Sequence, residues 1–352
     1  MGKLAVYKYV AIMFLVVQII VSLFTFMGLF GGDVTPVGNT ARAMLVYALP
    51  LLICANILLI FYWLIRRRWL FVLIPVITVA CCIPYMGTLI QFRSLDKSAE
   101  GKTGLKIASY NVAMFGRETS GFMALDIFAE MRRQKVDVLC MQEYSETSGD
   151  KKNSDTYKEY FPYMKIGRGD MVIYSRYPIK ESKTILFDDT NNSAMWADID
   201  VKGEELRVFN VHLQTTGINR TLYKAAKLQA QQDYDVSKSR LLSAIYGNYM
   251  MGMMFRSGQA ITVANEKRSS TKPCIVCGDF NDVPYSFVYN TMLGNMVDGF
   301  KECGSGFMYT FRGNKKVRID YIFHDESLKG LTYYKGDMTN SDHFPVFMKI
   351  AL

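Results

Sequence analysis

The sequence predicts an α/β domain that follows three membrane-spanning helices. Two observations lead to this prediction. Residues 1–92 contain three long apolar runs separated by short polar or basic stretches. From residue 105 onwards, short apolar runs typical of strands alternate with segments of helical periodicity, and this order is typical of α/β domains.

The first apolar run, residues 10–30, contains no charge, and its length of about 20 residues matches the thickness of a bilayer core. A cleaved signal peptide is the alternative, but its apolar region would be shorter and would end in small residues. We therefore expect an uncleaved anchor. The second and third runs, residues 44–65 and 69–92, are separated only by Arg66, Arg67 and Arg68, which predicts a tight helical hairpin.

The basic residues near these runs predict an orientation in the membrane. Lys3, Lys8 and the Arg66–Arg68 triplet are expected to stay in the cytoplasm. Three spans would then place residues 93–352 outside the cytoplasm. Basic residues just beyond the third run, at Arg93, Lys97 and Lys102, count against this orientation.

The charge of the chain favours anionic partners only mildly. Residues 1–92 hold six basic residues and one acid, so they account for +5 of the net charge of +9 and leave +4 for residues 93–352. This balance suits anionic substrates or lipid surfaces better than a strong nucleic-acid patch. The seven cysteines lie in apolar runs or end predicted strands, so we expect buried thiols rather than disulfides or metal ligands.

The predicted α/β domain, residues 105–352, follows a short polar linker at residues 93–104. Residues 122–134 have apolar side chains at helical spacing, and residues 214–272 have helical stretches without a strand signal. Strands are predicted, from their apolar runs, at residues 105–112, 136–141, 170–174, 195–201, 206–211, 274–277, 318–323 and 344–350.

Two polar residues follow the predicted strand at residues 274–277. Asp279 and Asn281 are two positions apart, so both point to the same side of an extended chain. A carboxylate accepts hydrogen bonds and an amide both donates and accepts, so the pair can hold a hard cation and a water. Gly278 lets the backbone approach closely or turn. A turn without chemistry is the alternative, since Asp and Asn both favour turns.

Other polar residues also stand at predicted strand ends, namely Asn111, Glu143, His212, Asp320, Asp342 and His343. Each has a structural alternative. Asn111 suits a turn cap, Glu143 the first solvated residue after a strand, and His212 a buried core histidine. Asp320 could pair with Arg318. However, two of the three histidines in the chain fall at such positions.

The motifs that contain these residues resemble those of the endonuclease/exonuclease/phosphatase superfamily. They are SYNV at 109–112, MQE at 141–143, YSRYPI at 174–179, NVHL at 210–213, CGDFND at 277–282, RIDYIF at 318–323 and SDHFPV at 341–346. The superfamily includes deoxyribonuclease I-like nucleases, abasic-site endonucleases, inositol polyphosphate 5-phosphatases and neutral sphingomyelinases. The resemblance covers residues 105–352 and implies a four-layer α/β sandwich of two packed mixed sheets flanked by helices. The three preceding apolar runs resemble membrane-attached bacterial members, which implies a multi-pass protein of the bacterial inner membrane.

The resemblance also implies roles for individual residues. Glu143 matches the principal Mg²⁺ ligand, Asn111 a secondary ligand or phosphate contact, and Asp342 a further acid near the metal. Asp279 and Asn281 match the pair that positions and activates the attacking water, and Asn281 also contacts substrate. His343 matches the histidine that contacts the scissile phosphate, and Asp320 the carboxylate that holds its ring. His212 matches a histidine of the deoxyribonuclease and phosphatase branches, which argues against the abasic-site branch. Arg176 is a candidate phosphate contact, with a solvated arginine as the alternative.

The function that these roles imply is a membrane-anchored phosphoesterase that uses Mg²⁺, or alternatively Mn²⁺. It would hydrolyse a phosphodiester or phosphomonoester, including lipid head groups, by in-line attack of water. The general base stays open between Asp279 and a histidine. A membrane-anchored nuclease and a non-catalytic membrane scaffold are the alternatives. The expected partners are the phosphate ester and the lipid bilayer, and the sequence indicates no particular protein partner.

Residues 241–255 form a further unusual stretch, because they contain four methionines and no charge. The stretch is too short to span a bilayer. It predicts either a core helix that packs outside a sheet or a segment that enters the membrane interface. Lys238, Arg240 and Arg256 flank it and could meet anionic head groups.

Overall fold

The computed structural model describes residues 3–94, 97–117, 122–145, 157–168, 170–188, 190–217, 227, 238–313 and 316–352. The chain forms two compact units. The first, which we call the helical unit, comprises Met1–Leu89 with Val283–Asn290. The second, the sandwich unit, comprises Ile90–Asp282 with Thr291–Leu352.

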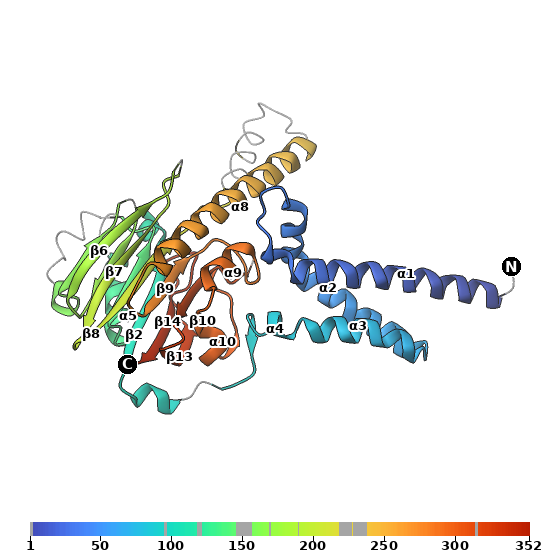
Figure 1. The fold of residues 1–352 in the computed structure, drawn as a ribbon, viewed down its shortest axis with the longest axis horizontal. Coiled ribbons are helices and arrows are strands. Elements are labelled where there is room, and N and C mark those ends of the chain that lie inside the picture. Colours follow the sequence, from blue (N-terminus) through green and yellow to red (C-terminus); the bar gives the residue numbers. More distant parts are fainter. Residues whose placement is uncertain are drawn as a thin grey trace. The chain divides into compact units, whose positions relative to one another are not determined.

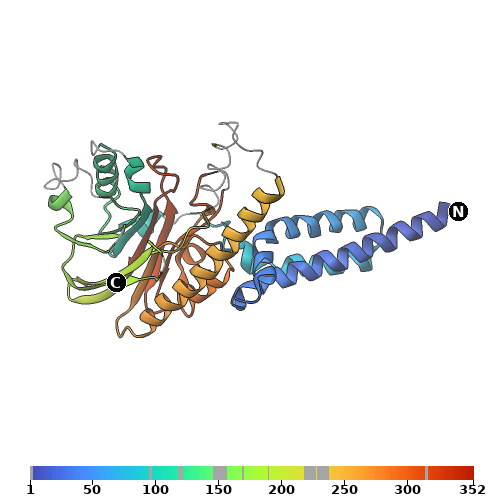
Figure 2. The ribbon, with the colours of Figure 1, turned by 90° about the horizontal axis from the view of Figure 1, so that it is seen from above.

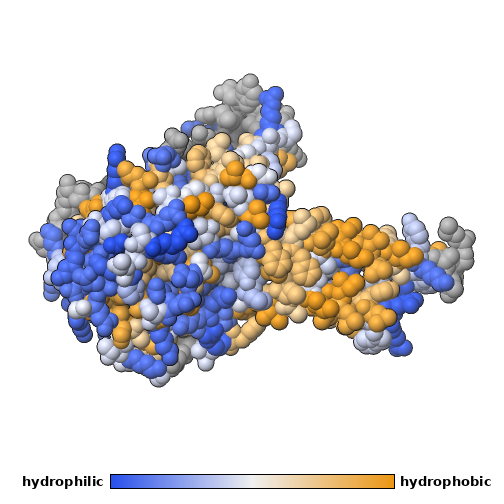
Figure 3. Space-filling view, in the orientation of Figure 1, coloured by the Kyte–Doolittle hydropathy of each residue, from blue (hydrophilic) through white to orange (hydrophobic). Residues whose placement is uncertain are grey.

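The helical unit contains two helices that are long and apolar enough to cross a membrane, within Val6–Asp33 and Thr40–Ile65. Its helices and turns are α1 (Lys3–Leu29), η1 (Gly31–Asp33), α2 (Thr40–Ile65), α3 (Trp69–Cys81) and α4 (Ile83–Met86). In the most apolar stretches of the two long helices, only 17% and 28% of the residues are buried. Figure 3 shows the resulting apolar surface of this unit. A core helix of a soluble protein would be mostly buried, and these two helices are not.

The prediction of three spanning helices is not supported. The third apolar run forms α3, which has 13 residues and ends at Cys81, before the single turn of α4. A helix of that length extends about 20 Å, whereas a bilayer core measures about 30 Å. Apolar composition alone did not indicate where this helix would end.

Buried polar side chains join the helices of this unit. Asn56 on α2 accepts a hydrogen bond from Ser22 on α1 at 3.0 Å and donates one to Thr25 at 2.9 Å. Gln18 on α1 donates to the main-chain oxygen of Phe71 on α3 at 3.0 Å. Because a buried polar group without a partner is costly, these contacts define how the three helices pack.

The sandwich unit contains two six-stranded sheets. The first has the order β13 (Lys329–Lys335), β14 (Val346–Ala351), β2 (Leu105–Asn111), β3 (Val138–Gln142), β5 (Val172–Ser175) and β4 (Tyr163–Ile166). The second has the order β10 (Val297–Asp298), β12 (Asp320–His324), β9 (Cys274–Asp279), β8 (Glu204–His212), β7 (Ser193–Val201) and β6 (Ile179–Leu186). β2 and β3 are parallel, as are β8 and β9, and the other pairs are antiparallel, so both sheets are mixed.

The two sheets pack face to face around one buried apolar cluster. Ile107 and Val138 of the first sheet and Val208 and Ile275 of the second belong to this cluster. On the other face of the first sheet, a second cluster includes side chains of α5 (Phe122–Arg133). α8 (Lys238–Arg268) runs along the outer face of the second sheet (Figures 1 and 2). The predicted arrangement of two packed mixed sheets flanked by helices is therefore confirmed.

Short elements complete the sandwich unit, and some of them involve the predicted linker at residues 93–104. They are β1 (Ile90–Gln91), η2 (Lys97–Gly101), η3 (Ala113–Arg117), α10 (Gly299–Cys303) and β11 (Gly306–Phe307), while α9 (Phe287–Leu293) begins in the helical unit and ends in the sandwich unit. β1 pairs with β11, and Arg93 donates to the main-chain oxygen of Lys301 at 2.6 Å. The described part of the linker is thus bound to the sandwich unit.

Candidate active site

The predicted site residues meet at one edge of the two sheets because two pairs of parallel strands end there. Asn111 at the end of β2 lies beside Gln142 at the end of β3, and Glu143 follows Gln142. In the second sheet, His212 at the end of β8 lies beside Asp279 at the end of β9. Parallel strands present their carboxyl ends to the same edge, so these side chains come together.

The Cys277–Asp282 motif has two positive φ angles, at Gly278 and Asn281, which are residue types that tolerate this conformation. A Cβ atom on Gly278 would lie 1.9 Å from the main-chain oxygen of Val211, and its φ is +140°, so this position requires glycine. Asn281 has a φ of +51°, which asparagine tolerates better than most residues. Its main-chain nitrogen donates to Asp279 Oδ1 at 2.8 Å, so the motif is both a turn and part of the site.

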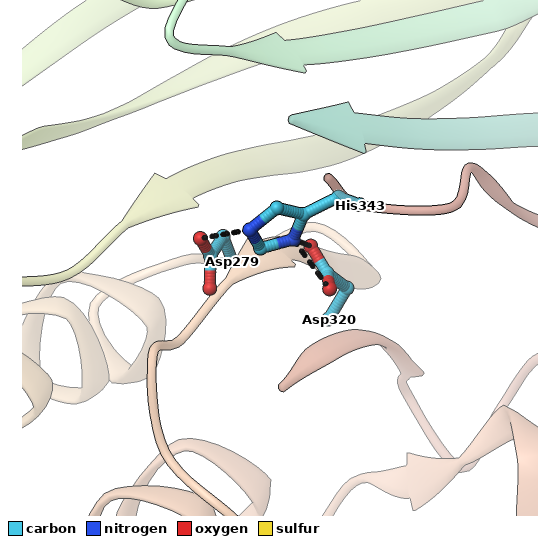
Figure 4. Close-up of side chains that lie close together, drawn as sticks. All are labelled: Asp279, Asp320 and His343. Carbon is cyan, nitrogen blue, oxygen red and sulfur yellow. Dashed lines mark hydrogen bonds and ion pairs between the residues drawn. The ribbon is translucent and has the colours of Figure 1, made fainter. Parts of the chain in front are cut away.

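His343 lies between two carboxylates (Figure 4). Its Nδ1 is 3.1 Å and 3.0 Å from the two oxygens of Asp320, and its Nε2 is 3.7 Å from Asp279 Oδ2. The hydroxyl of Thr310 accepts from the main-chain nitrogens of Ile319 and Asp320, each at 3.0 Å. The predicted pairing of Asp320 with the His343 ring is therefore present in the structure.

His212 has a comparable partner that the sequence analysis did not identify. Its Nδ1 lies 2.8 Å from Asp170 Oδ2. Asp170 comes just before β5, which is antiparallel to β3 and therefore starts at the edge where β3 ends. The sequence pattern predicts Asp170 only as the first residue of the strand at residues 170–174. A polar residue before an antiparallel strand is the signal that could have found Asp170.

The second nitrogens of both histidines face a common space. His212 Nε2 lies 3.8 Å from Glu143 Oε1 and 4.0 Å from Asp279 Oδ2. His343 Nε2 faces the same Asp279 oxygen at 3.7 Å. These separations exceed a direct hydrogen bond, and they suit a small polar group held between the rings and the carboxylates.

The charges around this space shift the pKa of each group. Burial lowers the pKa of His343, but the carboxylates of Asp320 and Asp279 outweigh it and raise the pKa to about 10. Burial also opposes the charged form of His212, and the hydrogen bond to Asp170 nevertheless raises its pKa above the usual value. Burial raises the pKa of Asp279 to about 6, against the lowering effect of the two rings. Near pH 7 the His343 ring is therefore a hydrogen-bond donor beside an ionised Asp279, and the partners of His212 favour its charged form.

Glu143 and Asn111 form a group of oxygen-bearing side chains that suits a hard cation. Asn111 Nδ2 lies 3.2 Å from Glu143 Oε1 and 3.0 Å from Asp279 Oδ2, so one donor holds two carboxylates together. Glu143 is 35% exposed at its side chain and has a φ of +50°. Strained backbone of this kind gathers at functional sites. Mg²⁺ needs only one or two carboxylates because it keeps several waters, and this pair meets that requirement.

Asp279, Asp320 and His343 form another cluster, in which one potential ligand atom of each lies within 4.8 Å of the others. Spacing alone would allow a metal ion there. However, the two Asp320 oxygens already accept from His343, whose raised pKa makes the ring a donor rather than a ligand. This cluster is therefore better described as a charge network, and Glu143 remains the candidate ligand for a cation.

Two predicted site residues are placed elsewhere. The side chain of Asp342 is exposed, with Ser341 Oγ 3.5 Å from its Oδ1, and it lies outside the cluster of Asp279, Asp320 and His343. Arg176 pairs with Asp137 at 2.8 Å, beside the start of β3, whereas Glu143 follows the end of that strand. The assignment of Arg176 as a phosphate contact is thus wrong, because antiparallel β5 carries it away from the site.

The structural alternatives for the other residues are also resolved. Arg318 forms a buried two-bonded ion pair with Asp298, at 2.8 Å and 2.6 Å, so it does not neutralise Asp320. Asn111 does hold a turn, since its Oδ1 accepts from the nitrogen of Ala113 at 3.1 Å, while its Nδ2 faces the site. All seven cysteines are free; Cys82, Cys140, Cys274 and Cys277 are buried, whereas Cys54 and Cys81 are exposed and Cys303 is partly buried, so the expectation of buried thiols holds for four of them.

Comparisons with known proteins agree with this fold. A profile of the endonuclease/exonuclease/phosphatase family matches residues 108–343, and a profile of a domain of unknown function (DUF8431) matches residues 11–89. No curated protein matches the chain.

Solved structures with a similar fold are distant in sequence. Humanized D. rerio TDP2 with 14 mutations is 17% identical, with a TM-score of 0.52, over 71% of this chain and 100% of that chain. D. rerio TDP2 complexed with single-strand DNA product is 16% identical, with a TM-score of 0.51 and the same coverage. An endonuclease/exonuclease/phosphatase from Beutenbergia cavernae DSM 12333 is 15% identical, with a TM-score of 0.50, over 71% of this chain and 72% of that chain. At these identities the likeness shows the fold alone.

Proposed function

Because the chain belongs to the endonuclease/exonuclease/phosphatase family, we propose that its sandwich unit is a divalent-metal-dependent phosphoesterase. Members of this superfamily are phosphoesterases such as nucleases, phosphatases and sphingomyelinases, and they typically use divalent metals. The observation that carries the proposal is the space bounded by His212 Nε2, His343 Nε2, Glu143 and Asp279. Two imidazole rings, both with raised pKa values, and two carboxylates around one space suit a phosphate ester and a water.

Glu143 would hold the cation, for which we propose Mg²⁺, with Mn²⁺ as the alternative, and Asn111 would orient the Glu143 carboxylate through its Nδ2. A bound divalent cation supplies charge that polarises phosphoryl oxygens and stabilises the leaving oxygen. Asn111 contributes to the site through its amide, which lies within 3.2 Å of Glu143 and 3.0 Å of Asp279.

The remaining residues would position and activate the reactants. Asp279 and Asn281 orient the attacking water, since Asn281 holds both oxygens of Asp279, at 2.8 Å and 3.2 Å. His212 and His343 donate from Nε2 to phosphoryl oxygens. Their Nδ1 atoms are held by Asp170 and Asp320, so the rings need little rearrangement as negative charge develops. Asp279 is the group best placed to accept the proton of the water, because its pKa of about 6 leaves it ionised near pH 7 while the His343 ring is already protonated.

We propose further that α1 and α2 anchor the chain in a membrane and that a lipid head group or another small phosphate ester is the substrate. The apolar outer surface of the two helices supports the anchor. The charge of +4 on residues 93–352 supports an anionic substrate without favouring long nucleic acid. There are two alternatives: a membrane-anchored nuclease and a non-catalytic membrane scaffold.

Hydrolysis assays on the detergent-solubilised chain test this function. Substrates would be phospholipid vesicles, bis-p-nitrophenyl phosphate, p-nitrophenyl phosphate, and single- and double-stranded DNA, each with Mg²⁺, with Mn²⁺ or with EDTA. We expect hydrolysis of phospholipid or of a small phosphate ester that EDTA abolishes and that the Glu143→Gln variant lacks. Preference for DNA would establish the nuclease instead. If the chain hydrolyses none of these substrates with any metal, the remaining interpretation is a non-catalytic scaffold.

A further inference from the structure

α8 emerges from the sandwich unit with a row of apolar side chains that the fold does not cover. The helix has 31 residues, and its C-terminal part packs on the second sheet through buried residues such as Ala260 and Val263. Towards its N-terminus, Leu242 is 66% exposed, Tyr246 49% and Met254 44%. Figure 3 shows apolar residues along this helix.

These side chains form a continuous ridge. Leu242, Tyr246, Met250 and Met254 are spaced four residues apart, so they lie one above the other on the helix surface. We call this row the α8 ridge. It extends about 18 Å along the helix. Met251, which is 59% exposed, lies beside it. An exposed apolar row of this length marks an interaction surface rather than scattered surface residues.

We propose that the α8 ridge lies on the surface of a lipid bilayer and seats the sandwich unit against it. This inference rests on the membrane anchor proposed above. If α1 and α2 anchor the chain in a bilayer, the same chain keeps α8 close to that bilayer, so α8 would meet lipid at a high effective concentration. Methionine side chains are adaptable, so Met250 and Met254 suit a fluid apolar layer.

The charge of α8 fits the same partner. Glu266 is the first acidic residue of the helix, so no carboxylate from Lys238 to Asn265 would repel anionic head groups. Lys238 and Arg240 stand at its N-terminal end, next to the ridge. Basic residues beside an exposed apolar row are typical of helices that lie in the membrane interface.

α8 also holds the two loops that carry site residues. Arg256 is fully buried, and its Nε lies 3.1 Å from Asp282, the residue after Asn281. Its Nη1 donates to the main-chain oxygen of Gln214 at 3.1 Å, two residues after His212. A helix seated on lipid would thus be connected directly to the loops of Asn281 and His212, so docking would favour hydrolysis of substrate in the bilayer.

Site-specific fluorescence on the full chain tests the docking without measuring activity. Cys54 and Cys81, the exposed native cysteines, would be replaced by serine. The environment-sensitive dye NBD would then be attached to Tyr246→Cys on the ridge or to the matched control Thr262→Cys, an exposed position about two turns C-terminal to the ridge on the same helix. The chain would be reconstituted in vesicles of phosphatidylcholine and phosphatidylglycerol. We expect blue-shifted emission and quenching by a lipid-borne quencher at position 246 but not at position 262.

Other outcomes of this experiment overturn the proposal. Equal emission and equal quenching at both positions would show that the ridge does not enter the lipid. A blue shift at position 246 that the lipid quencher does not reduce would show that protein, such as a second copy of the chain, covers the ridge. Flotation of the labelled chain with the vesicles reports the anchor separately, and a chain that fails to float would refute both anchor and docking.

A second arm connects docking to hydrolysis. Leu242→Ser with Met254→Ser should lower hydrolysis of vesicle phospholipid about tenfold, since two apolar contacts with lipid are lost, and leave a soluble phosphodiester unaffected. Thr262→Ser is the control and should change neither rate. Equal loss on both substrates would show that the ridge stabilises the fold instead. A chain inactive on all substrates would refute the proposed function, whereas the fluorescence experiment would still decide the docking.

Discussion

Gln142 on β3 donates a hydrogen bond from its side-chain amide to the side-chain oxygen of Asn210 on β8, over 2.6 Å. Asn210 in turn donates to the main-chain oxygens of Met141 and Val172, at 2.9 Å and 3.0 Å. Both amides are fully buried and belong to different sheets. Because Glu143 follows Gln142 and His212 lies two residues after Asn210, this pair fixes the separation of Glu143 and His212.

Replacing Asn210 by leucine should therefore harm both stability and catalysis. The variant leaves three buried groups without their partner, and each such loss costs about 1–3 kcal/mol. We expect a lower thermal unfolding temperature in detergent and a larger relative loss of turnover at temperatures where the variant is folded. Ser109→Ala, which removes a weaker contact to Gln142 at 3.1 Å, is the control. Normal turnover by folded Asn210→Leu would show that the pair does not position the site.

Glu143→Gln and Asp279→Asn should each abolish hydrolysis while the fold is retained. Both substitutions keep the shape of the side chain and remove its negative charge, which would cost several kcal/mol of transition-state stabilisation. Turnover would be measured with saturating Mg²⁺, and circular dichroism would report the fold. Near-normal turnover by either variant would contradict the role proposed for that residue.

Asp170→Asn should slow hydrolysis because Asp170 orients the ring of His212. Removing a carboxylate that holds an active-site histidine is expected to cost about 10- to 100-fold in rate. The pKa of His212 should also fall, since the Asp170 hydrogen bond is what raises it. NMR titration of the ring measures this shift. Asp188→Asn, at an exposed position, is the matched control. An unchanged rate together with an unchanged pKa would contradict this role.

Asp198 should make the stability of the chain depend on pH below its unfolded pKa of 3.8. Burial raises the pKa of Asp198, but hydrogen bonds from Arg207 and Lys272 outweigh it and lower the pKa below 3.8. The folded state therefore prefers the ionised form. Its stabilising contribution is complete above pH 3.8 and is lost as the pH falls through the lowered folded pKa.

This dependence can be measured through Trp196, whose ring lies 3.6 Å from the guanidinium of Arg207. Thermal unfolding would be followed by tryptophan fluorescence between pH 2 and pH 6, a range that brackets the unfolded-state pKa of 3.8 for Asp198. Asp198→Asn should lower the free energy of unfolding by about 3 kcal/mol at pH 6, because a buried charge loses its partner. The difference from the native chain should shrink towards pH 2. A pH-independent difference would exclude a linked titration.

The sandwich unit should lie outside the cytoplasm if residues 69–92 cross the membrane. α3 is short, so this crossing has to be tested. If residues 69–92 do not cross the membrane, the sandwich unit lies on the same side as Arg66–Arg68, which is the cytoplasm. A cysteine at Lys202, an exposed turn residue between β7 and β8, would be labelled with a membrane-impermeant maleimide in intact spheroplasts. Arg67→Cys is the internal control and should react only after lysis. The reverse pattern at position 202 would place the unit in the cytoplasm.

The sequence alone determined the fold family and most of the site. An apolar run followed by a polar residue is a local pattern, so Asn111, Glu143, His212 and Asp279 could be recognised without knowing their neighbours. Likewise, the length and apolar character of α1 and α2 follow from composition. The structure adds that these strand ends meet, as the parallel pairs β2–β3 and β8–β9 require.

Three of the longer strands, β4, β6 and β13, were missed because their residues carry no continuous apolar run, and the two-residue strands β1, β10 and β11 were missed as well. All four residues of β4 are exposed, most of β6 is exposed or partly buried, and β13 mixes exposed, partly buried and buried positions. Such strands at or near the edge of a sheet are stabilised by pairing with a strand that is distant in the sequence. A pattern read from a few consecutive residues does not reveal this partner strand. The helix α8 was expected only as helical stretches, since its apolar residues do not follow one face.

Only the tertiary structure decided which distant residues act together. Asp170 reaches His212, and Arg176 lies at the far end of β3, because β5 runs antiparallel to its neighbour. Gln142 meets Asn210 because two sheets pack face to face. Strand direction and sheet packing depend on the contacts of the whole chain. Local residue patterns can therefore identify the chemistry of a site, while its partners and its geometry emerge only when distant segments pack.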